Sequence, residues 1–166
     1  MAKFDPQKII TPIMKFVNMQ GIIALKDGML AILPLTVVGS IFLIIGQLPF
    51  EALNQAIASV FGKTWTEPFM QVYSGTFAIM GLISCFAIGF SYAKHSGVDP
   101  LPAGVLSVSS FFILLKSSYV QAKGEAIPDA IAKVWFGGQG IIGAIIIGLT
   151  VGAIYSFFIK RHIVIK

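Results

Sequence analysis

Long stretches without a charged residue alternate with short charged segments along this chain. The four uncharged stretches contain 23, 26, 16 and 26 residues, at positions 28–50, 68–93, 100–115 and 134–159. A helix needs about 20 mostly apolar residues to cross a bilayer, so three stretches are long enough and the third is borderline. The pattern predicts an all-α integral membrane protein with about four transmembrane helices.

Prolines disturb two of the predicted spans. The first span is expected over residues 28–48, and Pro34 within it removes a backbone hydrogen bond, so a kink is expected near Ala31. Pro100 and Pro102 open the third segment, 97–116, whose helix would be only about 20 Å long. If that segment is re-entrant rather than spanning, the C-terminus lies on the opposite side of the membrane from the N-terminus.

The residues before the first span have a different pattern. Residues 6–20 place apolar and polar side chains on separate helical faces, which is typical of a helix lying on the membrane surface. The apolar face consists of Ile10, Ile13, Met14 and Val17. We therefore divide the chain into an amphipathic cytoplasmic leader, 1–26, and a membrane region, 27–166; a loosely ordered basic leader is the alternative.

Small residues recur every four positions in the second and fourth predicted spans. This spacing lets helix backbones approach closely in lipid, where helices associate through packing. The second span has Gly81, Cys85, Gly89 and Ala93, and the fourth has Gly140, Ala144, Gly148, Gly152 and Ser156. We predict helix-packing roles for Gly81, Gly89, Gly140, Ala144, Gly148 and Gly152. Packing within one subunit and packing between subunits fit these stripes equally well.

Composition supports a membrane protein, and charge indicates its orientation. Hydrophobic residues make up 56% of the 166 positions and charged residues 11%, with a mean hydropathy of +0.87. Soluble domains carry about 25% charged residues. The net charge of +5 forms no basic patch with interleaved aromatic residues, so no nucleic-acid partner is expected. Of the 12 lysines and arginines, eight lie before the first span, after the second or after the fourth, and four lie in the other two loops. The positive-inside rule therefore places both termini in the cytoplasm.

Candidate chemistry is sparse in this sequence. It shows no nucleophile–histidine–carboxylate set, no paired carboxylates on one helix face and no metal-ligand spacing, so we predict no catalytic, metal-binding or cofactor-binding residue. Cys85 is interpreted as a packing residue, and His95 and His162 as solvated polar residues. The pattern G-x-G-x-x-G over 138–143 lacks the preceding strand and following acidic residue that dinucleotide binding requires.

Aromatic residues gather around the segment that joins the first two spans. Phe61 and Trp65 lie in the predicted loop 49–68, and Phe69 and Tyr73 follow them. Aromatic side chains of this kind are enriched where a membrane meets water. We interpret them as an interfacial belt; a platform that stacks against a substrate is the less favoured interpretation.

Several separated motifs resemble the membrane subunit IIC of bacterial sugar phosphotransferase systems, in the lactose/cellobiose/chitobiose family. They occur in the family's order and cover nearly the whole chain. The matching segments are Lys26 to Leu30, Leu33 to Leu35, Gly39-Ser40, Leu48-Pro49, Ala87 to Ala93, Val98-Asp99, Ala103 to Leu106, Trp135 to Gly140, Ala144 to Ile146 and Ile165-Lys166.

This resemblance implies a permease in the bacterial cytoplasmic membrane. Such subunits carry a β-linked disaccharide of cellobiose, chitobiose or lactose type while subunit IIB, supplied by IIA, phosphorylates it. Family members have about ten spans, dimerise through their N-terminal half and bind sugar in the later half. We therefore expect this chain to be the N-terminal scaffold and dimerisation half, truncated and inactive alone, with no catalytic residue of its own.

A different class of function stays open on the sequence. The small-residue stripes also suit a self-standing small membrane protein that acts by helix–helix association with a full-length permease. A pore ranks last, because no predicted helix has a polar face.

Overall fold

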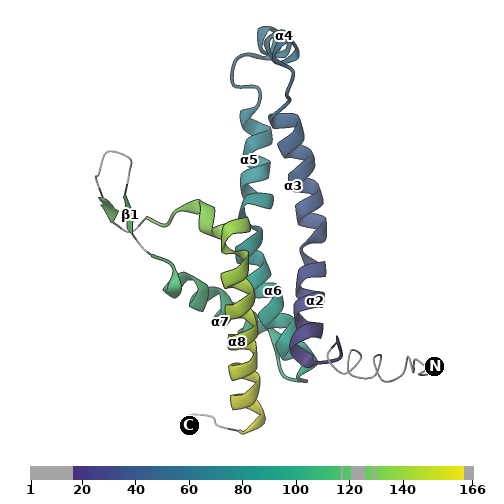
Figure 1. Cartoon of the computed structure of the whole chain (residues 1–166), viewed down its shortest axis with the longest axis vertical. Coiled ribbons are helices and arrows are strands. Elements are labelled where there is room, and N and C mark those ends of the chain that lie inside the picture. Colours follow the sequence, from purple (N-terminus) through teal and green to yellow (C-terminus); the bar gives the residue numbers. More distant parts are fainter. Residues whose placement is uncertain (1–16, 117, 121–125, 129, 163–166) are drawn as a thin grey trace, which may run out of the picture.

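The protein is a bundle of helices with one short β-hairpin (Figure 1). The structure, a computed structural model, describes residues 17–116, 118–120, 126–128 and 130–162. The predicted leader helix over 6–20 falls mostly outside these residues. The elements in chain order are α2 (Gln20–Ala31), α3 (Leu33–Gly46), α4 (Glu51–Phe61), α5 (Glu67–Gly75), η1 (Phe77–Ile79), α6 (Met80–His95), α7 (Pro100–Leu114), β1 (Ser118–Val120), β2 (Ala126–Pro128), η2 (Lys133–Phe136), η3 (Gly138–Gly140) and α8 (Ile141–Lys160).

The first span is broken into α2 and α3 at Ile32. Pro34 lies in the first turn of α3 and has no N–H to donate to the preceding turn. The Ile32 N–H instead donates to the Met29 carbonyl at 3.3 Å, a tighter turn than an α-helix makes. The kink predicted near Ala31 is thus found as a helix break one residue later. Helix α2 begins at Gln20, before the predicted start of the span at residue 28, and includes Lys26 and Asp27.

The second span is also interrupted, at a position that the sequence analysis did not predict. Thr76 ends α5 with φ −124° and ψ −89°, and η1 leads into α6. The Thr76 hydroxyl donates to the Val72 carbonyl at 2.6 Å, a local bond that competes with helix continuation. Gly39 of α3 lies against this break: a Cβ there would be 2.6 Å from Thr76 Oγ1.

The segment between these spans contains a helix where a loop was predicted. Helix α4 lies across the end of the α3–α5 hairpin (Figure 1). Its apolar residues Leu53, Ile57 and Val60 recur at helical spacing, with Glu51 and Gln55 on the other side. The loop prediction for 49–68 is therefore wrong over residues 51–61, because the amphipathic period was too short to stand out beside the longer apolar stretches.

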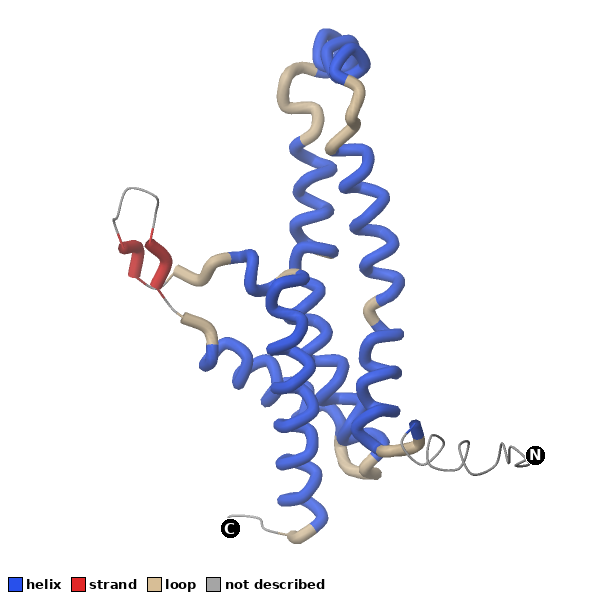
Figure 2. Tube along the Cα trace, viewed as in Figure 1, coloured by secondary structure: helices blue, strands red, loops and turns tan. Residues whose placement is uncertain are grey.

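A two-stranded antiparallel hairpin joins the bundle between α7 and η2 (Figure 2). Its register pairs Tyr119 with Ile127. The strands have three residues each, so the all-α fold class is confirmed with this small addition.

Helix α6 is the centre of the bundle, because α2, α7 and α8 all pack against it. Cys85, Phe111 and Ala144, one residue from each of α6, α7 and α8, form the buried core. Three helical stretches are long and apolar enough to cross a membrane, at Gln20–Gly46, Glu67–His95 and Gly138–Lys160, and α7 is a shorter apolar helix. This result agrees with the prediction of about four spans whose third is borderline.

Outward-facing side chains of the bundle are largely apolar. On α3, Val37, Ile41 and Ile44 are 55%, 50% and 64% exposed, and on α8 Ile142 is 69% exposed. A water-soluble domain rarely leaves such a continuous apolar surface uncovered. This surface suits contact with lipid.

Candidate functional site

Two of the predicted packing glycines in α8 bring its backbone against α6. A Cβ at Gly148 would lie 2.9 Å from the Cys85 carbonyl oxygen and 3.0 Å from the Ile88 Cβ. A Cβ at Gly152 would lie 2.8 Å from the Tyr92 Cβ. Only a residue without a side chain fits at either position unless the helices move apart.

The other predicted packing residues face different neighbours. A Cβ at Gly89 of α6 would contact the Ser107 hydroxyl of α7 and lie 3.1 Å from the Ala103 carbonyl. Gly81 lies against the Gly137 carbonyl, where a Cβ would be at 2.7 Å, and a Cβ at Gly140 would collide with the Trp135 carbonyl. Ala144 belongs to the buried core. All six residues therefore have close neighbours within this subunit.

Cys85 lies at the point where α6 meets α7. Its side chain has no exposed surface, and its Sγ lies 3.3 Å from the Ser107 carbonyl oxygen. A small, polarisable side chain fills such a narrow space well. This position agrees with its interpretation as a packing residue.

A polar cluster joins α2 to the end of α6. His95 Nε2 lies 2.8 Å from Asp27 Oδ2, and Lys26 Nζ lies 3.3 Å from Asp27 Oδ1. The Gln20 amide donates to the Tyr92 carbonyl at 3.2 Å and also contacts the Ser96 hydroxyl. His95 is exposed, as predicted for a solvated residue, but its contact with Asp27 was not predicted. The two partners are 68 positions apart, and no local spacing links them.

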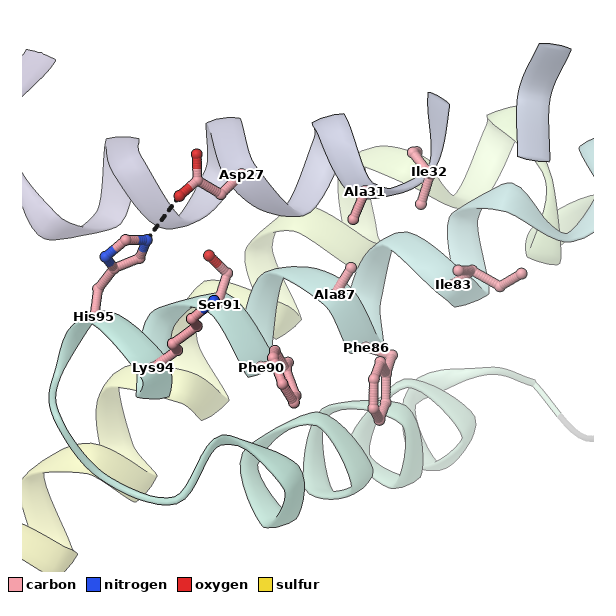
Figure 3. A pocket seen from close by; sticks show the side chains of 10 residues that line it. All are labelled: Asp27, Ala31, Ile32, Ile83, Phe86, Ala87, Phe90, Ser91, Lys94 and His95. Atoms are coloured by element: carbon pink, nitrogen blue, oxygen red, sulfur yellow. Dashed lines mark hydrogen bonds and ion pairs between the residues drawn. The ribbon is translucent and has the colours of Figure 1, made fainter. Parts of the chain in front are cut away.

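Beside this cluster, α2 and α6 enclose a groove of about 360 Å³. Figure 3 shows its lining, with charged side chains at one end and apolar ones along the rest. The lining residues are Asp27, Ala31, Ile32, Ile83, Phe86, Ala87, Phe90, Ser91, Lys94 and His95. The sequence analysis found none of these as a site, because the groove forms only when the two helices pack.

Aromatic residues cluster where α3 meets α5. The rings of Trp65 and Phe69 meet edge to face with centroids 5.9 Å apart, and Phe42 lies 6.2 Å from Phe69. Phe61 is 76% exposed beyond them. An interfacial belt at this end of the molecule stays a prediction.

The remaining candidate chemistry is limited. Within the described ranges, no three His, Cys, Asp or Glu side chains gather as a metal site would require. The glycine pattern over 138–143 forms η3 and the first turn of α8, and it follows η2 rather than a strand. This local geometry differs from that of a dinucleotide-binding turn.

Comparisons with known proteins match almost the whole chain. The family model for "Phosphotransferase system, EIIC" matches residues 26–166. The lichenan permease IIC component of Bacillus subtilis is 35% identical over 86% of this chain, and the cellobiose-specific EIIC component of Geobacillus stearothermophilus is 32% identical over 92%. The crystal structure of ChbC, the IIC component of an N,N'-diacetylchitobiose-specific system, superposes on 96% of this chain with a TM-score of 0.86 and 31% identity.

These matches cover only part of each relative. The chain spans 33% of the lichenan permease component, 35% of the cellobiose component and 38% of the ChbC chain. The similarity therefore describes about a third of a permease.

Proposed function

Because the chain belongs to the phosphotransferase system EIIC family, we propose that it is part of a permease that takes up a β-linked disaccharide of cellobiose, chitobiose or lactose type. The observation that carries the proposal is the superposition on the chitobiose transporter over 96% of this chain. The named substrates of the relatives supply the sugar class.

The proposal extends to partners and location. In this scheme the permease lies in the bacterial cytoplasmic membrane as a homodimer with a cytoplasmic N-terminus. Subunit IIB phosphorylates the sugar and receives its phosphate from IIA. The start of α2, the α6–α7 turn and the end of α8 all lie toward one end of the bundle, which supports chain ends on the same side (Figure 1).

Within this permease, we assign residues 26–166 a scaffold role. Sugar hydroxyls are recognised by precisely placed polar groups, and the four uncharged stretches hold no acidic or basic side chain. The close contacts around α6 hold α2, α7 and α8 against it. We therefore expect this chain alone neither to bind nor to move sugar.

Uptake of radiolabelled cellobiose tests this role. A permease-null strain that supplies IIA and IIB and expresses only this chain should show no uptake above the empty vector. Clear uptake would overturn the scaffold role.

A chimera tests membership of a working permease. Residues 26–166 replace the matching segment of the Geobacillus stearothermophilus cellobiose component, and uptake should persist in the same strain. A matched chimera carrying Gly148→Ile should lose it, because the added side chain separates α8 from α6. Loss of uptake in the unmodified chimera, with normal membrane expression, would contradict the proposal.

A self-standing small protein that associates with a full-length permease is not favoured. The small-residue stripes on which it depended have their close neighbours within this subunit.

A further inference from the structure

The groove between α2 and α6 separates polar from apolar groups along its length. Lys94 and His95 lie at the end near the α6–α7 turn, and Ala31 and Ile83 lie toward the other end (Figure 3). A ligand that fits such a groove has a charged or polar head and an apolar tail. That description is the chemistry of a lipid.

Ser91 supplies an independent sign of a ligand. It is only 6% exposed and lines the groove, and its oxygen points toward α2 (Figure 3). The hydroxyls of Ser84 and Ser107, also buried in this bundle, donate to carbonyls at 2.6 and 2.7 Å. Among the described residues, the Ser91 hydroxyl has no such partner. Unlike Ser156 Oγ, which is fully buried without a partner, the Ser91 oxygen is not shut off from solvent, so this hydroxyl is available to a molecule bound in the groove.

Lys94 is the cation through which the polar end of the groove can meet an anion. The Asp27 carboxylate is already occupied, with His95 on one oxygen and Lys26 on the other. Lys94 is exposed and has no ion-pair partner in the described part of the chain. Basic pockets between membrane helices commonly hold acidic lipid headgroups.

We propose that this groove binds one anionic phospholipid. Its phosphate lies beside Lys94 and the Ser91 hydroxyl, and one acyl chain lies along Ala31, Ile83 and Phe86. The surface next to the groove on α2 and α3 is apolar, with Leu30 and Leu33 more than half exposed, so a lipid in the groove is continuous with the surrounding bilayer. The proposal does not depend on which sugar the permease takes up.

Native mass spectrometry of the whole chain tests this site. The chain is purified in detergent and mixed with phosphatidylglycerol, with phosphatidylcholine of the same acyl chains, or with glycerol 1-phosphate. We expect one retained phosphatidylglycerol per chain and weaker retention of the other two. If phosphatidylcholine were retained as well as phosphatidylglycerol, the anionic headgroup would have no role in binding. If glycerol 1-phosphate bound equally well, the site would recognise a free phosphate and not a lipid. Either result would overturn the proposal.

Variants then locate the lipid. Lys94→Gln should weaken phosphatidylglycerol binding about fivefold, the effect of one basic residue near a lipid surface. Lys160→Gln removes the same charge from the end of α8, outside the groove, and should have no effect. Ser91→Ala should weaken binding by removing one donor without disturbing the fold. Equal losses in the two lysine variants, or full binding by both Lys94→Gln and Ser91→Ala, would overturn the site.

Discussion

Adding one methyl group at each of two glycines of α8 distinguishes the effect of close packing from the effect of helix propensity. A Cβ at Gly148 would lie 2.9 Å from the Cys85 carbonyl, whereas a Cβ at Gly143 would have no heavy atom of a neighbouring element within 4 Å. Gly148→Ala should therefore destabilise the bundle by about 1–3 kcal/mol through overpacking. Gly143→Ala should leave stability unchanged or slightly higher, because alanine favours helix.

Reversible unfolding of the purified chain in mixed micelles measures both variants. The same methyl group is added to the same helix, so a general effect of substitution cancels. Equal stabilities for the two variants would contradict the close approach of α8 to α6.

The contact between Asp27 and His95 makes a second prediction at this scale. Asp27→Ala and His95→Ala should each lower stability slightly, by less than Gly148→Ala, because both side chains are about a third exposed. The double variant should lose no more than the larger single loss, since each change removes the same interaction. Raising the salt concentration should reduce the coupling. Strictly additive losses would show that the two side chains do not interact.

The sequence predicts which face of a helix a residue lies on, but not which residues it contacts. The four-residue spacing places the small residues on one face of α6 and on one face of α8, because helix geometry alone decides which residues share a face. It did not identify what those faces meet, nor the partner of His95. Those contacts depend on how distant segments pack, and one sequence carries no local sign of them.

Among the elements, α4 carries a prediction about the membrane surface. Val60 on its apolar side is 75% exposed, and Gln55 on its polar side is also exposed. An amphipathic helix at the interface buries its apolar side among lipids. In a Cys85→Ala background, Gln55→Cys should react with a water-soluble maleimide much faster than Val60→Cys when the chain is in a bilayer.

The isolated chain in detergent-free denaturant is the control for this experiment, because both cysteines should then react alike. Equal rates in the bilayer would show that α4 does not lie on the membrane.

Helix breaks were predictable only where the covalent chemistry forces them. Pro34 cannot donate a hydrogen bond whatever surrounds it, so the break at Ile32 was visible in the sequence. Thr76 is an ordinary residue in many helices, and its break accompanies the close approach of Gly39 from α3. Such a break depends on how the helices pack and not on the residue type alone.

At the level of the whole molecule, orientation in the membrane is the main prediction. Helix α4 and the end of α8 lie at opposite ends of the bundle (Figure 1). With both chain ends in the cytoplasm, Lys63→Cys near α4 should react with an impermeant maleimide on intact cells. Arg161→Cys after α8 should react only once the cells are opened; both variants are made in the Cys85→Ala background.

Two results would count against this orientation. Labelling of Arg161→Cys on intact cells would place the end of α8 outside, and protection of Lys63→Cys would place α4 inside. The Cys85→Ala chain without an introduced cysteine has no thiol and gives the background labelling.

The buried thiol at the centre of the bundle can also be used to measure how often the helices around it separate. Cys85 is the single cysteine of the chain and has no exposed surface where α6 meets α7. A thiol reagent can reach it only during moments when these helices separate, so its modification rate counts those openings. The rate of Cys85 modification in the unaltered protein thereby gives the frequency of core opening. A bound lipid that stabilises the bundle should lower this rate.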